Sequence, residues 1–173
     1  MRIPEAVAKI GKLLPKGVTV SHRQGNFPAV TIICPEAERD QLAAKMVKQF
    51  SGVGYTPSVR RPVHNQIIVE VVGDWPMLVE WFQVFAAFER IEAVIPGASC
   101  GMITLGERGE YEVQAWLKGA GQEETVTALT EILPEVVGSD DFQIEVRKDH
   151  LTLKVPKWSM MAEVMERVAP SIG

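Results

Sequence analysis

The chain has 173 residues, of which 46% are hydrophobic and 23% are charged, and it carries a net charge of −4. This length is enough to bury a core, and the composition excludes a disordered or collagen-like chain. Because the net charge is negative, the molecule as a whole has no attraction to nucleic acid or to anionic membranes. A polyanionic partner would therefore need a local basic patch.

Cysteine usage and the N-terminal residues predict a location in the cytoplasm. The two cysteines, Cys34 and Cys100, form no C-x-x-C pair, so the sequence encodes neither a zinc site nor a disulfide framework. Glu5, Lys9 and Lys12 interrupt the N-terminal apolar residues, which leaves no signal-peptide core. No later apolar run reaches the roughly 20 residues that span a bilayer. We expect a cytoplasmic protein that uses no cofactor or metal and binds no membrane.

The first predicted element is an amphipathic helix. Ile3, Val7, Ile10 and Leu14 recur at spacings of three and four, which places them on the inward face of a helix.

A hairpin and a second helix follow in residues 17–50. Apolar and polar residues alternate in residues 18–23 and again in residues 30–34, with the turn RQGNF between them. Pro35 is well placed to open a helix, because its missing N–H is not needed there. The expected inward face of this helix consists of Leu42, Ala43, Met46, Val47 and Phe50.

The second hairpin and helix, from Val59 onward, are more apolar than the first. The strand IIVEVV has almost no polar positions, and the helix that begins near Trp75 is apolar almost all round. Elements of this kind are buried on more than one side, so we expect both to lie centrally in the molecule.

Two further hairpin-helix units complete the chain, in residues 99–137 and 142–168. Their strands alternate between apolar and polar residues, and their helices carry apolar stripes. The stripe of the first helix is Val126, Leu129, Leu133 and Val136, and that of the second is Trp158, Met161, Ala162, Met165 and Val168.

The sequence therefore predicts an α+β fold with an N-terminal helix followed by four ββα units. Strands with one apolar face form antiparallel sheets that carry helices on one face only. Pairing the units two by two gives a half in residues 1–95, with the N-terminal helix, and a half in residues 96–173. The two halves form either separate domains or one packed domain.

Two segments resemble each other enough to raise the question of an internal duplication. When Trp75 is aligned with Trp158, Met77 matches Met160 and Glu80 matches Glu163. Duplication of a ββα unit would produce such matches. Chance similarity between hairpins and amphipathic helices would also produce them, and the residues favour neither explanation.

The catalytic motifs that the sequence contains have the wrong context. GASCG fits the G-x-S-x-G pattern with Ser99 as nucleophile, but that elbow requires a strand before the serine and a helix after it. Here the order is helix and then strand. Asp140 and Asp141 are typical of a turn. These observations favour a protein without catalytic activity.

One tryptophan is predicted on the polar face of a sheet. If Tyr111 and the alternate residues after it face the helices, Trp116 faces the opposite side together with Gln114 and Lys118. Tryptophan is favoured as an interface anchor, so we expect these three residues to bind a partner. Cover by another part of the same chain is an equally good explanation.

Basic residues recur at the predicted hairpin turns. If the four hairpins point the same way, these residues form one positive rim that binds phosphate or carboxylate groups. The candidate anion-binding residues are Arg23, Arg60, Arg61, His64, Arg108, Arg147, Lys148 and His150.

The function predicted from these patterns is a non-catalytic protein-interaction module, such as an adaptor, an inhibitor or an assembly subunit. It would bind a protein partner or a second copy of itself through the sheet face and the hairpin rim. One alternative is binding of nucleic acid or another phosphate-rich ligand through the basic hairpin tips. Another is an enzyme of unfamiliar class with its site between the two halves.

Overall fold

The computed structural model describes residues 1–52, 58–60, 63–94, 99–105, 112–118, 123–138, 141–148, 150–168 and 170. Within these ranges the chain forms five helices and nine strands. The helices are α1 (Ile3–Leu13), α2 (Glu36–Gln49), α3 (Trp75–Val94), α4 (Glu123–Val137) and α5 (Trp158–Val168). The strands are β1 (Thr19–His22), β2 (Ala29–Ile33), β3 (Phe50–Gly52), β4 (Ser58–Arg60), β5 (Gln66–Glu70), β6 (Ser99–Leu105), β7 (Glu112–Lys118), β8 (Gln143–Arg147) and β9 (His150–Val155).

The strands form two sheets. Sheet A has the order β1-β2-β5-β4 and is antiparallel throughout, and sheet B has the order β3-β6-β7-β9-β8. Sheet B is antiparallel except for the pairing of β3 with β6, which is parallel. The predicted α+β class, the N-terminal helix and the antiparallel sheets are confirmed. Two hairpins pair through their second strands in each sheet, but an internal duplication stays a prediction.

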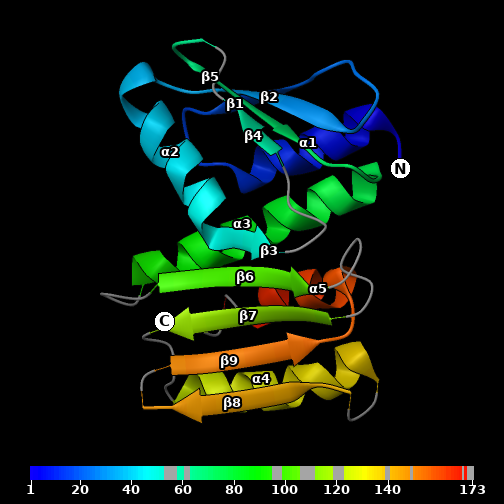
Figure 1. Ribbon diagram of the computed structural model, residues 1–173, viewed down its shortest axis with the longest axis vertical. Helices are drawn as coiled ribbons and strands as arrows, with labels where there is room; N and C mark the ends of the chain where they lie inside the picture. Colours follow the sequence, from blue (N-terminus) through cyan, green and yellow to red (C-terminus); the bar gives the residue numbers. More distant parts are fainter. Residues whose placement is uncertain are drawn as a thin grey trace.

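The second unit provides the centre of the molecule, as its apolar composition predicted. Strand β5 is an inner strand of sheet A, and α3 contacts α1, α5 and β6. Figure 1 shows α3 running between the two sheets, with α4 and α5 behind sheet B. Trp81 of α3 is fully buried, stacks on Phe85 with ring centroids 5.9 Å apart and meets the edge of Phe82 at 4.7 Å. Residues from both sheets and from all five helices belong to one hydrophobic cluster.

Most predicted inward residues of the helices are buried, but the prediction for α2 was wrong at two positions. Leu42, Ala43 and Met46 are buried, whereas Val47 is 59% exposed. Phe50 does not belong to the helix, because α2 ends at Gln49 and Phe50 begins β3. The prediction was wrong here because helical spacing alone does not show that the chain leaves the helix to pair with β6 of sheet B.

No helix in the described ranges is long and apolar enough to cross a membrane.

Candidate functional site

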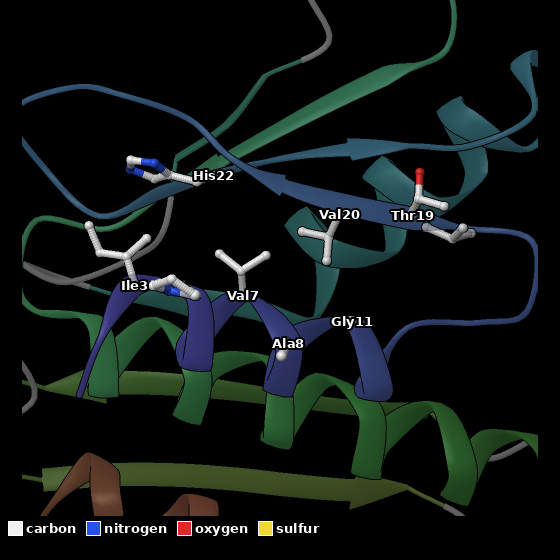
Figure 2. A pocket seen from close by; sticks show the side chains of 9 residues that line it. Ile3, Val7, Ala8, Gly11, Thr19, Val20 and His22 are labelled. Atoms are coloured by element: carbon white, nitrogen blue, oxygen red, sulfur yellow. The ribbon is translucent and has the colours of Figure 1, made fainter.

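A groove of about 810 Å³ lies between helix α1 and strand β1. Figure 2 shows Ile3 and Val7 of the helix on one side of the groove, and Val20 and His22 of the strand on the other. The lining is almost wholly apolar and consists of Ile3, Pro4, Val7, Ala8, Gly11, Val18, Thr19, Val20 and His22. Such a surface has the size and character of a ligand or peptide site.

The groove exists because α1 uses only part of its apolar surface to pack on the protein. Ala6 and Ile10 are completely buried, and Val7 is half-buried. Ile3 was predicted to point inward, but the residue is 37% exposed, because it begins the helix at the end of the groove next to His22. The predicted inward face of α1 is therefore divided between the core and an open groove.

Gly11 fixes how close the helix and the strand lie at the other end of the groove. A Cβ atom added to Gly11 would be 3.3 Å from Cγ1 of Val20, which is tighter than an ordinary van der Waals contact. The absence of a side chain at Gly11 therefore permits this close approach of α1 to β1.

Strand β1 is an edge of sheet A, and its hydrogen-bonding direction can be derived from one bond. The N–H of Arg23 donates to the carbonyl of Ala29 at 3.0 Å. In an antiparallel pair, hydrogen-bonded and non-hydrogen-bonded residue pairs alternate, so Ser21 and Thr19 also bond to β2. The N–H and C=O groups of Val20 and His22 consequently point away from β2, toward the open edge of the sheet.

A second, more polar pocket of about 480 Å³ adjoins the groove and shares Ile3 and His22 with it. The turn between β1 and β2 forms one side, and residues 73–75 at the start of α3 form the other. The ring of His22 meets the ring of Trp75 edge to face at 5.5 Å. Asp74 caps α3, because its Oδ1 accepts a hydrogen bond from the N–H of Met77 at 3.0 Å.

Two described side chains have a shifted pKa, and neither lines the groove. Half-burial in α3 raises the pKa of Glu80 to about 7, and the negative charge of Asp74 adds to this shift. Burial also raises the pKa of the Cys34 thiol; Glu38 adds to that shift and Arg39 opposes it. Cys34 is 3% exposed, which confirms its interpretation as a small core residue.

Among the described residues, no group of three or more His, Cys, Asp and Glu side chains is arranged to hold a metal ion.

Sheet A does not bring its predicted anion-binding residues into one rim. Arg23 lies beside Ala29, at the end of the sheet where β5 finishes. His64 lies at the opposite end, where the N–H of Cys34 donates to the carbonyl of Asn65. His64 and Arg60 are exposed, and Nδ1 of His64 is 3.6 Å from Oε1 of Glu36. The strand order places the two hairpin turns of this sheet at opposite ends, because β2 and β5 pair antiparallel.

Two of the predicted anion-binding residues, Arg61 and Arg108, lie outside the described residues.

The last hairpin brings together residues that the sequence assigned to different roles. The backbone of His150 pairs with Arg147 on one side and with Lys118 on the other, which forms one row across three strands. Arg147 is exposed, and its Nε lies 2.6 Å from Oε1 of Glu145. Lys148 is exposed in the turn with a φ of 50°.

The register of sheet B places Trp116 opposite Thr152 and Gln114 opposite Lys154. In β9, the half-buried Thr152 and Lys154 alternate with three buried residues, Leu151, Leu153 and Val155. Residues paired directly across a ladder share a sheet face. Positions 114 and 116 therefore belong to the face turned away from α5, although their side chains and that of Lys118 lie outside what the structure describes.

Sequence reasoning missed the groove, because the local pattern of its strand suggests a different position in the sheet. Residues 19–22 read TVSH, a strand without a charged side chain, and they follow a helix whose inward stripe begins at its first residue. Edge strands usually carry charge or proline, so an uncharged strand suggests an interior position. Only the strand order shows that β1 is an edge.

No protein-family model matches this chain, and a comparison with curated proteins likewise finds no match.

Proposed function

We propose that this chain is a non-catalytic protein-interaction module and that the groove between α1 and β1 is its binding site. The observation that carries this proposal is the open apolar lining, in which the partly exposed Ile3 and Val7 face Val20 and His22. Exposed apolar surface next to a free strand edge is costly for a protein that has no partner, because it invites aggregation.

The chemistry of the lining also supports binding rather than catalysis. Among the described residues that line the groove, His22 alone is titratable. General acid-base or nucleophilic catalysis needs a second group within hydrogen-bond reach of the first. The other described residues of the groove lining are apolar, apart from Thr19. Apolar lining of this kind recognises shape and hydrophobic surface.

A second candidate surface is the face of sheet B that carries positions 114, 116 and 118. Figure 1 shows α4 and α5 on the other side of this sheet, and no described helix covers the face of Thr152 and Lys154. Trp116 remains our predicted anchor there. The row formed by Lys118, His150 and Arg147 at one end of this face favours a polyanionic ligand as the alternative.

Affinity capture from cells that make the protein, with nuclease-treated and untreated extracts, tests these surfaces against each other. The baits are the unaltered chain, Ile3→Lys in the groove and Trp116→Ala on sheet B. Loss of a protein partner with Ile3→Lys alone supports the groove, and loss with Trp116→Ala alone moves the site to sheet B. A complex that disappears with nuclease and at high salt would replace the proposal by nucleic-acid binding.

A further inference from the structure

We propose that the groove binds an extended acidic segment of a partner protein, which adds to β1 as a fifth strand of sheet A. This inference rests on the proposed function, and it names the chemistry and the conformation of the segment that is bound.

The backbone of β1 provides the template. The N–H and C=O groups of Val20 and His22 point away from β2, because the Arg23–Ala29 pair sets the alternation of the ladder. A second bond agrees with this direction: the N–H of Val71 donates to the carbonyl of Pro28. Because bonding alternates along the ladder, the backbone of Val30, two residues after Pro28, also bonds to β5 and not to β1. Four outward groups are thus available, which suits a partner strand of about five residues.

Side-chain alternation determines which partner residues meet the groove. Successive side chains of an added strand point to opposite sides of the sheet. Every second one would lie on the side of α1 and contact the exposed flank that Ile3, Val7 and Ala8 form. These positions require apolar residues, and the positions between them face outward and can carry charge.

The net charge of the segment that forms the groove favours one sign for those outward residues. Residues 1–24 contain five Lys or Arg and one Glu, in a chain whose net charge is −4. The five basic residues are all exposed: Arg2, Lys9, Lys12, Lys16 and Arg23. Lys9 and Glu5 form an exposed ion pair at 3.5 Å, so most of this positive charge is not balanced within the segment. An acidic strand is attracted to it, and a basic strand is repelled.

The same charge argues against a second copy of the chain as the occupant. A symmetric dimer through β1 would place two copies of residues 1–24 side by side, and both copies are basic.

The other sheet edges are less suited to take a strand. Strand β8 carries Glu145 and Arg147, and charged side chains on an edge oppose pairing with another chain. Strands β3 and β4 have three residues each. Strand β1 combines an uncharged edge with an apolar floor beside it.

The test uses the full chain and a labelled synthetic peptide in which Glu and Val alternate over eight residues. Binding is followed by fluorescence anisotropy at low and high salt. We expect this peptide to bind at least about tenfold more tightly than a Lys-Val peptide of the same length, and we expect the advantage to shrink as salt rises. Equal affinity for the two peptides, or no binding of either, would overturn the inference.

A proline variant tests the strand pairing itself. His22→Pro removes an N–H that points outward, so it leaves the ladder to β2 intact while it blocks the partner strand. The matched control is His22→Ala, which loses the same side chain and keeps the N–H. We expect His22→Pro to weaken peptide binding about tenfold more than His22→Ala does, and equal binding by both variants would contradict strand addition.

Two further measurements test the inference without the proline variant, in case that variant does not fold. Ile3→Glu and Ile3→Lys both remove an apolar contact of the groove, but only Ile3→Glu also repels an acidic strand, so Ile3→Glu should weaken binding of the Glu-Val peptide more than Ile3→Lys does. Amide hydrogen exchange of the unaltered protein should show that the N–H groups of Val20 and His22 become protected when peptide is added, while that of Ser21 changes little. Unchanged exchange at Val20 and His22 would refute strand addition even if the peptide binds.

These results are separable from the proposed function. If a natural partner is lost with Ile3→Lys but the acidic peptide gives no protection of β1, the groove binds a partner in another conformation and only this inference fails. If the partner is unaffected by every groove variant, both fail.

Discussion

His22 and Trp75 pack edge to face, with ring centroids 5.5 Å apart and ring planes at 61°. This contact joins the last residue of the edge strand β1 to the first residue of α3, the described helix that contributes most residues to the hydrophobic core. It also lies where the groove and the more polar pocket meet. A ligand in the groove would therefore contact the ring of His22, which packs against Trp75, and a ligand in the polar pocket would contact both rings.

The His22–Trp75 contact predicts a measurable coupling in stability. A double-mutant cycle with His22→Ala and Trp75→Ala, measured by urea denaturation, should give a coupling free energy of about 0.5 kcal/mol, the lower end for aromatic pairs because His22 is exposed. His64→Ala is the control, because that exposed histidine lies at the opposite end of sheet A and should show no coupling with Trp75. Additive effects of His22→Ala and Trp75→Ala would contradict the contact.

Glu80 predicts how stability depends on pH. Its pKa rises from 4.5 to about 7 on folding, so the folded state keeps a proton that the unfolded state has already lost between these two pH values. Stability contributed by the neutral carboxyl is therefore lost as pH rises from 4.5 to about 7. Glu80→Gln should raise the free energy of unfolding at pH 8 by roughly 1 to 2 kcal/mol, a value discounted because the side chain is half exposed, and should change it little at pH 4.

The matched control for this experiment is Glu163→Gln. Glu163 occupies the corresponding position after Trp158, but its side chain is exposed in α5. Denaturation curves at pH 4 and pH 8 should be displaced equally for this variant. If the difference in free energy of unfolding between Glu80→Gln and the unaltered protein is the same at pH 4 and pH 8, the raised pKa of Glu80 is contradicted.

Gly17 predicts a backbone effect at the entrance to β1. Its φ is +83°, a region that residues with a Cβ atom adopt only with strain, and no atom lies near the position of an added Cβ. Gly17→Ala should lower the free energy of unfolding by about 1 kcal/mol, and Gly17→Asn should lower it less, because Asn tolerates this conformation. Equal thermal midpoints for the two variants would show that the backbone is not constrained here.

Two tryptophans should respond differently to truncation. Trp81 is fully buried between Phe82 and Phe85, so Trp81→Ala should cost about 3 to 5 kcal/mol of stability. Trp116→Ala, on the sheet face that no described helix covers, should leave the thermal midpoint nearly unchanged and lower affinity only for a partner of that face. A large loss of stability with Trp116→Ala would identify Trp116 as a core residue.

Local patterns were sufficient for most of the elements. The alternation in residues 30–34 and the apolar stripes of α4 and α5 each depend on one segment, and each agrees with the burial of the described side chains. In residues 18–23 the agreement is partial, because Val18 and Val20 are half-buried but His22 is exposed. The apolar character of β5 and α3 predicted their central place. The prediction that Phe50 belongs to α2 was wrong because of a distant strand, since Phe50 pairs with Met102 of β6.

The candidate site depended on relations that no local pattern contains. The sequence by itself predicted a strand in the alternating residues 18–23 and an amphipathic helix with Ile3, Val7, Ile10 and Leu14 on one face. It also determines that basic residues outnumber acidic ones in residues 1–24. It did not determine that this strand is an edge, that Ile3 remains exposed, or that the turns of sheet A lie at opposite ends. Only the tertiary structure decided these three features. Strands β2 and β5 lie far apart in the chain, and the hydrogen bonds between them leave β1 with one unpaired side.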